Sequence, residues 1–162
     1  MNMIFSADRN WGIGYKNQLL FRVSADMKRF RKMTTGKAVI MGRKTLDSLP
    51  GGRPLPNRTN IVLSRDPDFT AEGVIVCRDL DELFGETGNY PEGDVFVIGG
   101  EQVYRLLAPY CRKAYITRWN AEAKADTFME DLSKNPQWRL SEVSGPMEED
   151  GLEFVFELYV RV

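Results

Sequence analysis

The chain has 162 residues, of which 43% are hydrophobic and 28% charged, and its formal net charge is −1. These values are typical of a soluble globular protein, and we expect residues 1–162 to form one domain. The near-neutral charge gives no basic surface for nucleic acid or membranes, and no apolar run reaches the roughly 18 residues of a membrane span.

The sequence contains no histidine and only two cysteines, Cys77 and Cys111. Histidine-dependent nucleophilic catalysis, histidine-ligated metals and thiolate-only zinc sites are therefore excluded, and we expect no metal. Acid–base chemistry has to use a carboxylate, lysine, tyrosine, cysteine or water. The first residues are typical of a strand and not of a signal peptide, so we expect a cytoplasmic protein.

Short apolar runs between polar and glycine- or proline-containing segments predict a series of strands and helices. The strands expected in chain order are Met3–Ala7, Ala38–Met41, Asn60–Ser64, Val74–Cys77, Asp94–Ile98, Lys113–Trp119, Trp138–Val143 and Leu152–Val162. The helices expected are Ser24 to about Thr35, a short stretch through Ser48-Leu49, Leu80–Phe84 and Gln102–Leu107. Strands that alternate with helices predict βαβ units and a mainly parallel sheet, to which the last two strands add an antiparallel edge.

The segment Asp8–Gly14 reads as a glycine-punctuated loop that leaves the first strand. It carries two large apolar side chains, Trp11 and Ile13. They either pack on the edge of the core or cover something as a lid, and the sequence leaves both open.

The segment Ser24–Thr34 predicts an amphipathic helix in which one acid has an unusual place. At about 100° per residue, Met27, Phe30, Met33 and Thr34 form an apolar arc, and Lys28, Arg31 and Lys32 lie opposite. Asp26 lies within the apolar arc, one turn before Phe30. Since burying an unpaired charge is costly, this carboxylate needs a partner, a ligand or water in a cleft. In the alternative interpretation Ser24 is the N-cap and Asp26 only favours the helix dipole.

Glycines or basic residues follow four of the predicted strands. They are Gly42-Arg43-Lys44-Thr45, Ser64-Arg65, Arg78 and Gly99-Gly100. Ligands of open α/β sheets bind at the carboxyl ends of strands, where arginine, lysine and free N–H groups can bind phosphates. Each motif alone is typical of a tight turn, and neither GxGxxG nor GxxxxGK[ST] is present. Their recurrence favours a ligand with several phosphates.

Arg58 follows the rigid segment Pro54-Leu55-Pro56 and directly precedes a predicted strand. On the local sequence it is either a solvated turn arginine or a clamp for a carboxylate, which arginine binds through two parallel hydrogen bonds.

Seven stretches together carry a resemblance that covers nearly the whole chain. They are Asp8-Arg9-Asn10 through Ile13-Gly14, Ala25-Asp26 with Phe30, Val39–Thr45, Arg53–Asn60, Val97–Tyr104, Tyr115-Ile116-Thr117 and Asp126-Thr127. In this order and spacing the chain resembles the dihydrofolate reductase family. The resemblance implies an eight-stranded sheet flanked by four helices, and a cis peptide between Gly99 and Gly100. It implies an oxidoreductase that reduces 7,8-dihydrofolate to tetrahydrofolate, by hydride transfer from NADPH to C6 and protonation at N5.

The resemblance also implies roles for particular residues of the substrate site. Asp26, Phe21 and Thr117 would be catalytic: Asp26 would bind the pterin and promote protonation at N5 through water, and Thr117 would hydrogen-bond Asp26 and the pterin amino group. Arg58 would hold the α-carboxylate of the glutamate tail. The folate slot would be lined by Ile4, Phe5, Ser6, Met27, Phe30, Leu49, Leu55 and Ile98.

On the cofactor side the resemblance implies a longer set. It comprises Ser6, Ile13, Gly14, Leu19, Gly42, Arg43, Lys44, Thr45, Leu63, Ser64, Arg65, Arg78, Ile98, Gly99, Gly100, Glu101, Gln102, Val103 and Tyr104. Arg43, Ser64, Arg65 and Arg78 would lie near the 2′-phosphate, and Gly99–Tyr104 would hold the pyrophosphate and nicotinamide. Antifolate inhibitors are implied partners, and a monomer is the default for the family.

The chain departs from the family pattern at three places. Leu20-Phe21 stands where the family usually has Pro-Trp, so the water that the tryptophan N–H holds near the pterin is in doubt. Ser24 replaces a proline, which an N-cap role would make harmless. Ala125–Glu130 stands where the family usually has Gly-Asp-Thr followed by an aromatic residue and proline, which puts the coupling of Asp126 to the Ile13–Leu20 lid in doubt.

Two other functions compete with this interpretation. A reductase of the same fold that acts on a phosphoribosyl substrate in riboflavin synthesis would also bind NADPH, but Asp26, Phe30 and Arg58 favour dihydrofolate. A binding protein that has lost activity, through Phe21 and the altered loop, would bind folate or NADPH without turnover.

Overall fold

The computed structural model describes all 162 residues. Its strands are β1 (Asn2–Ala7), β2 (Gly12–Gly14), β3 (Ala38–Gly42), β4 (Thr59–Leu63), β5 (Val74–Cys77), β6 (Val95–Gly99), β7 (Lys113–Trp119), β8 (Thr127–Phe128), β9 (Trp138–Val143), β10 (Met147–Glu149) and β11 (Leu152–Arg161). Its helices are α1 (Ser24–Thr34), α2 (Arg43–Ser48), α3 (Leu80–Thr87) and α4 (Glu101–Leu107). None of the helices is both long and apolar enough to cross a membrane.

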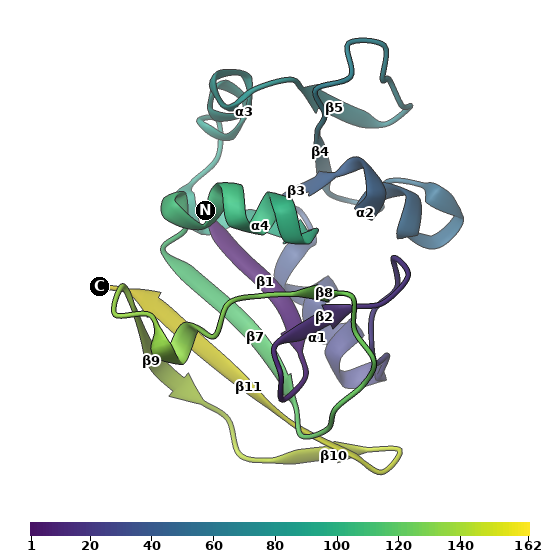
Figure 1. Ribbon diagram of the computed structural model, residues 1–162. Helices are drawn as coiled ribbons and strands as arrows, with labels where there is room; N and C mark the ends of the chain where they lie inside the picture. The colour runs from purple at the N-terminus through teal and green to yellow at the C-terminus, as the bar shows by residue number, and fades with distance from the viewer.

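One large sheet runs in the order β10-β11-β7-β1-β6-β3-β4-β5. The strands from β7 to β5 are parallel to one another, and β11 is antiparallel to β7. β10 pairs with the first half of β11 and β9 with the second half, so these two strands share one position at the edge of the sheet. The sheet therefore has nine strands in eight positions. Figure 1 shows β5 and α3 at one end of the molecule and β10 at the other. The predicted fold class, a mainly parallel sheet with an antiparallel C-terminal edge and four helices, is confirmed.

The main strands and helices lie where the apolar runs predict them, with ends that differ by one to three residues. Three small strands, β2, β8 and β10, are additional. Gly12–Gly14, expected in a loop, forms β2 and pairs with β8, and Met147–Glu149 forms β10 against β11. Strands this short carry too few residues for alternation to reveal them, and they form only because a distant segment pairs with them.

The two faces of the sheet bury two separate apolar clusters, since successive side chains of a strand point to opposite faces. Met3, Ile40, Ile61, Val97 and Ile116 lie in the larger cluster, on the face that also packs against α3 and α4. Ile4, Val39, Met41, Val62 and Phe96 lie in the second cluster, which Phe30 and Met33 of α1 help to cover. The second cluster is therefore the floor on which α1 places its apolar side.

Trp11 packs on the core and does not serve as a cover for a ligand. Only 6% of its surface is exposed, and the Arg118 guanidinium carbon lies 4.0 Å from the centre of its ring. Ile13 is partly buried against the same cluster. The loop before them is fixed by Asp8, whose carboxylate accepts hydrogen bonds from the backbone N–H groups of Asn10, Gly12 and Ala123.

Both cysteines are free and buried. Burial raises the pKa of the Cys77 thiol to about 11 and that of Cys111 to about 12. Neither thiol is therefore a thiolate near neutral pH, and neither is available as a nucleophile.

The N-terminus of α1 is not capped as the sequence predicts. Val23, not Ser24, is the N-cap residue, and no side chain of the cap hydrogen-bonds to the helix. The carboxylate of Glu149 from β10 instead accepts hydrogen bonds from the backbone N–H groups of Ser24 (2.5 Å) and Ala25 (3.2 Å). A charged acceptor at a helix N-terminus satisfies free N–H groups and favours the dipole, so a distant carboxylate does the work expected of the serine hydroxyl.

Candidate active site

The carboxyl ends of six parallel strands lie along one edge of the sheet, and the predicted site residues lie at this edge. β1 is the central strand, with β7 on one side and β6 on the other. On the β7 side, α1 covers the sheet; on the β6 side follow the glycine-rich ends of β6 and β3. The edge therefore has an α1 side and a β3–β5 side, which meet at β1.

Asp26 and Thr117 form the centre of the α1 side. Asp26 lies in the first turn of α1, and the Thr117 hydroxyl on β7 donates a 2.6 Å hydrogen bond to its Oδ1 atom. Thr117 is 3% exposed and Asp26 is half-buried. Burial raises the pKa of the Asp26 carboxyl, although the Thr117 hydrogen bond and the charge of Arg29 oppose the rise. Asp26 therefore has a hydrogen-bond partner within the protein in addition to its place in the first turn of α1.

The apolar side chains expected beside this pair belong to one cluster. Phe30, Leu49, Leu55 and Ile98 all pack with Ile4 in the second cluster. Ser6 lies opposite Thr117 in the β1–β7 register. Met27 follows Asp26 in α1 and is 43% exposed. Phe5 differs from the prediction in orientation: its ring packs in the larger cluster and lies 5.4 Å from that of Tyr104.

Arg58 is not a solvated turn arginine. Its Nε atom donates to the Oγ1 atom of Thr34 (3.0 Å), and its Nη1 atom donates to the Pro56 carbonyl (3.0 Å). Thr34 is fully buried at the end of α1, and the guanidinium carbon lies 5.9 Å from the ring centre of Phe30. These contacts fix the plane of the guanidinium and leave its Nη2 atom free. Partial burial and the nearby Arg31 lower the pKa of Arg58, as unpaired positive charges do to each other.

The ends of β3 and β6 meet through two glycines and a threonine. The peptide between Gly99 and Gly100 is cis, as the family resemblance implies, and φ of Gly99 is +130°. A Cβ atom on Gly99 would lie 3.3 Å from the hydroxyl of Thr45 in α2. Gly42 is as closely packed, since a Cβ atom there would lie 3.2 Å from Val103. Glycine at these positions keeps the backbone N–H groups accessible to a ligand.

The residues after Gly100 divide between the edge and the core. Glu101, at the start of α4, pairs with Arg105 and accepts a 3.4 Å hydrogen bond from the N–H group of Phe128. The Tyr104 hydroxyl donates to the Ile4 carbonyl (2.9 Å), and complete burial raises its pKa far above the ordinary value. Tyr104 is therefore a neutral packing residue whose hydroxyl is already bonded within the protein.

The predicted phosphate-binding residues gather around the turn after β4. Arg43 pairs with Asp66 (3.4 Å) and stacks on Phe69, whose ring centre lies 4.6 Å away. The Nη2 atom of Arg78 donates to the Pro67 and Phe69 carbonyls, while its buried Nη1 atom has no partner. Ser64 and Arg65 occupy the same turn, with Leu63 at the end of β4 and Lys44 in α2. Arg78 thus holds the turn and keeps one donor for a ligand.

The segment between β2 and α1 lies across the site. Leu19 belongs to it and is 43% exposed, whereas Ile13 and Gly14 lie in β2 itself, directly before the segment. Its tip is a turn at Lys16 and Asn17, both with positive φ, and the Asn17 side chain donates to the Lys44 carbonyl (2.9 Å). The Lys16 N–H donates to the Asp126 carboxylate (2.9 Å), so the coupling that the altered Ala125–Glu130 sequence put in doubt is present.

Phe21 ends this segment and packs edge-on against Trp119, with ring centres 5.7 Å apart. Trp119 is 2% exposed, and its indole N–H has no hydrogen-bond partner. Phe21 itself has no polar atom, so it can contribute only packing beside Asp26.

Three residues position the site although sequence reasoning gave them no role. Glu149 caps α1, Asn17 joins the lid segment to α2, and Asn60 pins the loop before Arg58. Asn60 is 3% exposed, exchanges hydrogen bonds with both backbone groups of Leu55 and donates to the Arg58 carbonyl. An asparagine inside an apolar strand pattern is a signal that could have indicated Asn60, whereas Glu149 and Asn17 lie in polar segments without one.

The fold is that of an α/β protein in which a hydrogen-bonded carboxyl, Asp26, and the group Arg43, Arg65 and Arg78 lie along the carboxyl edge of the parallel strands. A sequence profile of the family described as dihydrofolate reductase matches residues 1–161. The dihydrofolate reductase of Bacillus subtilis is 36% identical over 163 residues, with 99% of this chain and 94% of that protein covered. The Staphylococcus haemolyticus enzyme is 32% identical over 163 residues, with 100% and 96% covered.

A solved structure of the Enterococcus faecalis dihydrofolate reductase, complexed with NADP(H) and RAB-propyl, has a TM-score of 0.88. It is 31% identical, and the match covers 99% of this chain and 95% of that one. The chain belongs to the dihydrofolate reductase family. The predictions of an enzyme, of dihydrofolate reductase activity and of NADPH as cofactor are thereby confirmed.

Proposed function

We propose that this chain reduces 7,8-dihydrofolate to tetrahydrofolate, with Asp26 as the residue that binds the pterin and supports protonation at N5. The observation that carries the assignment is the hydrogen bond from Thr117 to the half-buried carboxyl of Asp26, on the helix whose Phe30 and Met33 cover the second apolar cluster. A half-buried carboxyl with a raised pKa changes its charge more readily near neutral pH than an exposed one. The chain offers no histidine for this task.

The residues of the β3–β5 side fit an NADPH molecule. Gly42 and Gly99 allow the ends of β3 and β6 to pack closely against Val103 and Thr45, and the unpartnered Nη1 atom of Arg78 calls for an acceptor such as a phosphate oxygen. We assign the 2′-phosphate to Arg43, Ser64, Arg65 and Arg78, and the lid to Ile13, Gly14 and Leu19. When bound, NADPH supplies the hydride, and the protein supplies binding, orientation and exclusion of water.

On the substrate side, each group of this chain has one task. Asp26 accepts hydrogen bonds from the pterin amino group and the adjacent N–H, and Thr117 keeps the carboxyl in place. The slot lined by Ile4, Phe30, Leu49, Leu55 and Ile98 excludes water from the ring. Arg58, with Nη2 free, binds the α-carboxylate of the glutamate tail, and antifolate inhibitors bind in the same slot.

The two competing functions are less well supported. A phosphoribosyl substrate has no use for a carboxyl in an apolar slot or for an arginine fixed on Phe30, and both are present. The inactive binding protein would be favoured by an incomplete site, but Phe21 is the only predicted catalytic position that lacks a polar group. One domain over residues 1–162, the monomeric state and the cytoplasmic location stay predictions.

The test is the loss of NADPH absorbance when protein, NADPH and dihydrofolate are mixed, with Asp26→Asn beside the wild type. The amide keeps the shape and the Thr117 contact but has no proton equilibrium. We expect hydride transfer to fall by at least about 10²-fold, the usual contribution of acid–base catalysis, with NADPH affinity unchanged. Equal rates in both proteins would remove Asp26 from the mechanism. Tight NADPH binding without turnover in the wild type would favour the inactive binder.

A further inference from the structure

Arg29 is a charged side chain in the apolar environment of α1 for which the proposed reaction gives no use. It lies three residues after Asp26 on the same helix, a spacing that makes the two side chains neighbours. Lys28, Arg31 and Lys32 extend into solvent, but Arg29 is half-buried and lies against the sheet. A half-buried charge that faces the sheet is unusual on a helix with three solvated cations, so it needs an explanation.

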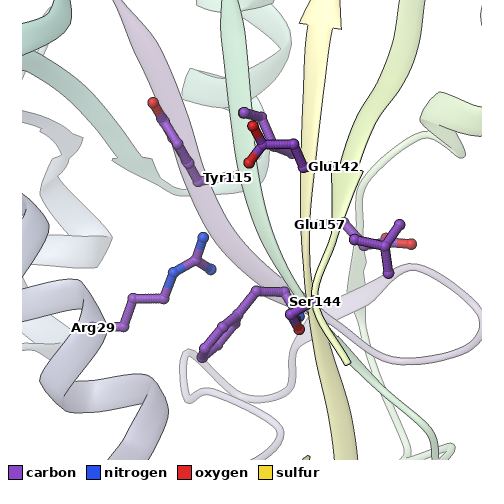
Figure 2. Close-up of a pocket in the computed structure, with 8 residues that line it drawn as sticks. Arg29, Tyr115, Glu142, Ser144 and Glu157 are labelled. Carbon is purple, nitrogen blue, oxygen red and sulfur yellow. Dashed lines mark hydrogen bonds between the residues drawn. The ribbon is translucent and has the colours of Figure 1, made fainter. Parts of the chain in front are cut away.

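The guanidinium of Arg29 is clamped but not paired. Its carbon atom lies 4.0 Å from the ring centre of Phe156 on β11, the distance of a stacked cation–π contact. No hydrogen bond or ion pair within the protein uses its N–H groups. Figure 2 shows the side chain reaching from α1 toward the strands, with Tyr115 and Glu142 on the far side of the pocket. This pocket has a volume of about 200 Å³ and is lined in part by Arg29, Tyr115, Glu142, Ser144 and Phe156.

The strand register places this cation beside the catalytic pair. Phe156 lies opposite Thr117, and Leu158 lies opposite Tyr115, in the antiparallel pairing of β11 with β7. Side chains at opposite positions share a face, so the ring under Arg29 is the direct neighbour of the threonine that donates to Asp26. Arg29 and Asp26 are thus held side by side by two adjacent strands.

We propose that Arg29 is an electrostatic positioning residue for Asp26: clamped on Phe156 and left without a partner, its guanidinium supplies the fixed positive charge that this carboxyl faces. A cation that pairs with no other carboxylate acts at full strength on the nearest one, and burial weakens the screening by solvent. Asp26 and Arg29 accordingly affect each other's pKa, each favouring the charged form of the other, although burial raises the pKa of Asp26 and lowers that of Arg29.

Few other charged groups share this environment. β7 contributes Tyr115 and Thr117, β9 contributes Glu142, and Glu149 of β10 lies at the N-terminus of α1. β1 has no titratable side chain, and the residues of β11 on this face are Phe154, Phe156 and Leu158. Glu157 points to the other face and pairs with Arg118. Lys113 of β7 and Arg139 of β9 share this face of the sheet by register, but neither lines the pocket, where Arg29 is the only cation.

The sign of the effect follows from the charge. A nearby cation favours the carboxylate, so removing it raises the pKa of Asp26 and keeps the carboxyl protonated to higher pH. We expect Arg29→Gln to shift the midpoint of Asp26 titration upward by about half to one pH unit, roughly three- to tenfold in the ionisation constant. Arg29→Lys keeps the charge and should titrate close to the wild type.

The experiment follows the carboxyl carbon of Asp26 by ¹³C NMR against pH in the complete, ligand-free protein, for wild type, Arg29→Gln, Arg29→Lys and Lys28→Gln. Lys28→Gln is the matched control, since it loses the same charge from the solvent side of α1. An upward shift in Arg29→Gln alone supports the proposal. An unshifted midpoint in Arg29→Gln, or equal shifts in Arg29→Gln and Arg29→Lys or in Arg29→Gln and Lys28→Gln, would overturn it.

The pH profile of single-turnover hydride transfer gives a second readout, which rests on the proposed function of Asp26. If Asp26 must be protonated, the midpoint of the profile moves upward with the NMR midpoint in Arg29→Gln. Should the NMR midpoint move while the rate profile stays in place, Arg29 keeps its electrostatic role and the catalytic role of Asp26 fails. The two proposals are therefore tested separately.

Discussion

The α1 side and the β3–β5 side of the site differ in how they use charge. The α1 side has the half-buried carboxyl of Asp26 at its centre. A hydrogen bond with Thr117 fixes this carboxyl, and a hydrogen bond to Thr34 fixes Arg58. The β3–β5 side has several partly exposed arginines whose contacts, such as the Arg43–Asp66 pair at 3.4 Å, are weak and replaceable. We therefore expect single residues to decide function on the α1 side and the sum of many charges to decide binding on the β3–β5 side.

The largest effect after Asp26→Asn is expected for Arg58→Gln. Losing a charge-assisted bond to the glutamate carboxylate should raise the Kd for dihydrofolate by about 10- to 100-fold, because such bonds contribute about 1.5–3 kcal/mol. Fluorescence titration in the presence of NADPH measures the change. A pterin without the glutamate tail should bind both proteins equally, and Arg139→Gln, an exposed arginine on β9, is the control. A loss of affinity for the tail-less pterin would mean that Arg58 supports the loop and does not bind the tail.

A smaller effect is expected for Arg43→Gln on the β3–β5 side. Because neighbouring cations remain, NADPH affinity should fall only about three- to tenfold, while NADH affinity stays the same. The difference in NADPH affinity between the wild type and Arg43→Gln should shrink as salt increases, since exposed charges are screened. Equilibrium titrations at two ionic strengths check this, with Arg112→Gln, exposed and paired with Glu92, as the control. If NADH affinity fell equally, Arg43 would not contact the 2′-phosphate.

Phe21→Trp should increase the rate of the reaction through a change on the α1 side. The indole N–H would add a donor beside the carboxyl, where Phe21 has none, and could hold a water molecule near the pterin. We expect hydride transfer to become a few-fold faster in single-turnover kinetics, an increase of well under about 2 kcal/mol in transition-state stabilisation. Phe21→Leu, which changes size without adding a donor, should not accelerate the reaction. An unchanged or slower rate in Phe21→Trp counts against this role.

The smallest effect is expected for Glu149→Ala, which removes the cap of α1. The loss of two hydrogen bonds to the helix N-terminus should cost about 1 kcal/mol and lower Tm by about 2–4 °C. Thermal unfolding followed by circular dichroism measures this. Glu148→Ala removes the same charge from the exposed neighbour and should leave Tm in place. Equal changes in the two variants would show that net charge, and not the cap, is responsible.

Prediction from sequence succeeded where residues close in the chain decide the structure. The apolar runs determine the main strands, and the place of Asp26 on the apolar arc of α1 called for a partner, a ligand or water, of which the structure shows a partner, Thr117. It failed where a distant segment decides. The cap of α1 comes from Glu149, 125 residues beyond Ser24, and the β2–β8 pair joins two short polar segments. Local patterns carry no information on such contacts.

The candidate site shows the same limit. The sequence allowed two roles for Arg58, a solvated turn arginine or a clamp for a carboxylate. Only its contacts with Thr34 and Pro56 in the structure exclude the first role. Arg78 was predicted to face a phosphate, and the structure adds that its Nη2 atom holds the turn after β4. How an arginine divides its five donors depends on tertiary packing, which no spacing in the sequence encodes.

The two buried cysteines have a practical consequence for observing the lid segment. Their thiols remain protonated near neutral pH and are shielded from reagents, so the protein has no background of reactive sulfur. A single Lys16→Cys exchange at the exposed tip would then be the sole attachment point for a fluorophore or spin label. Because the Asn17 side chain next to it holds the tip to Lys44, the signal of such a label would report each departure of the segment from α2 in real time.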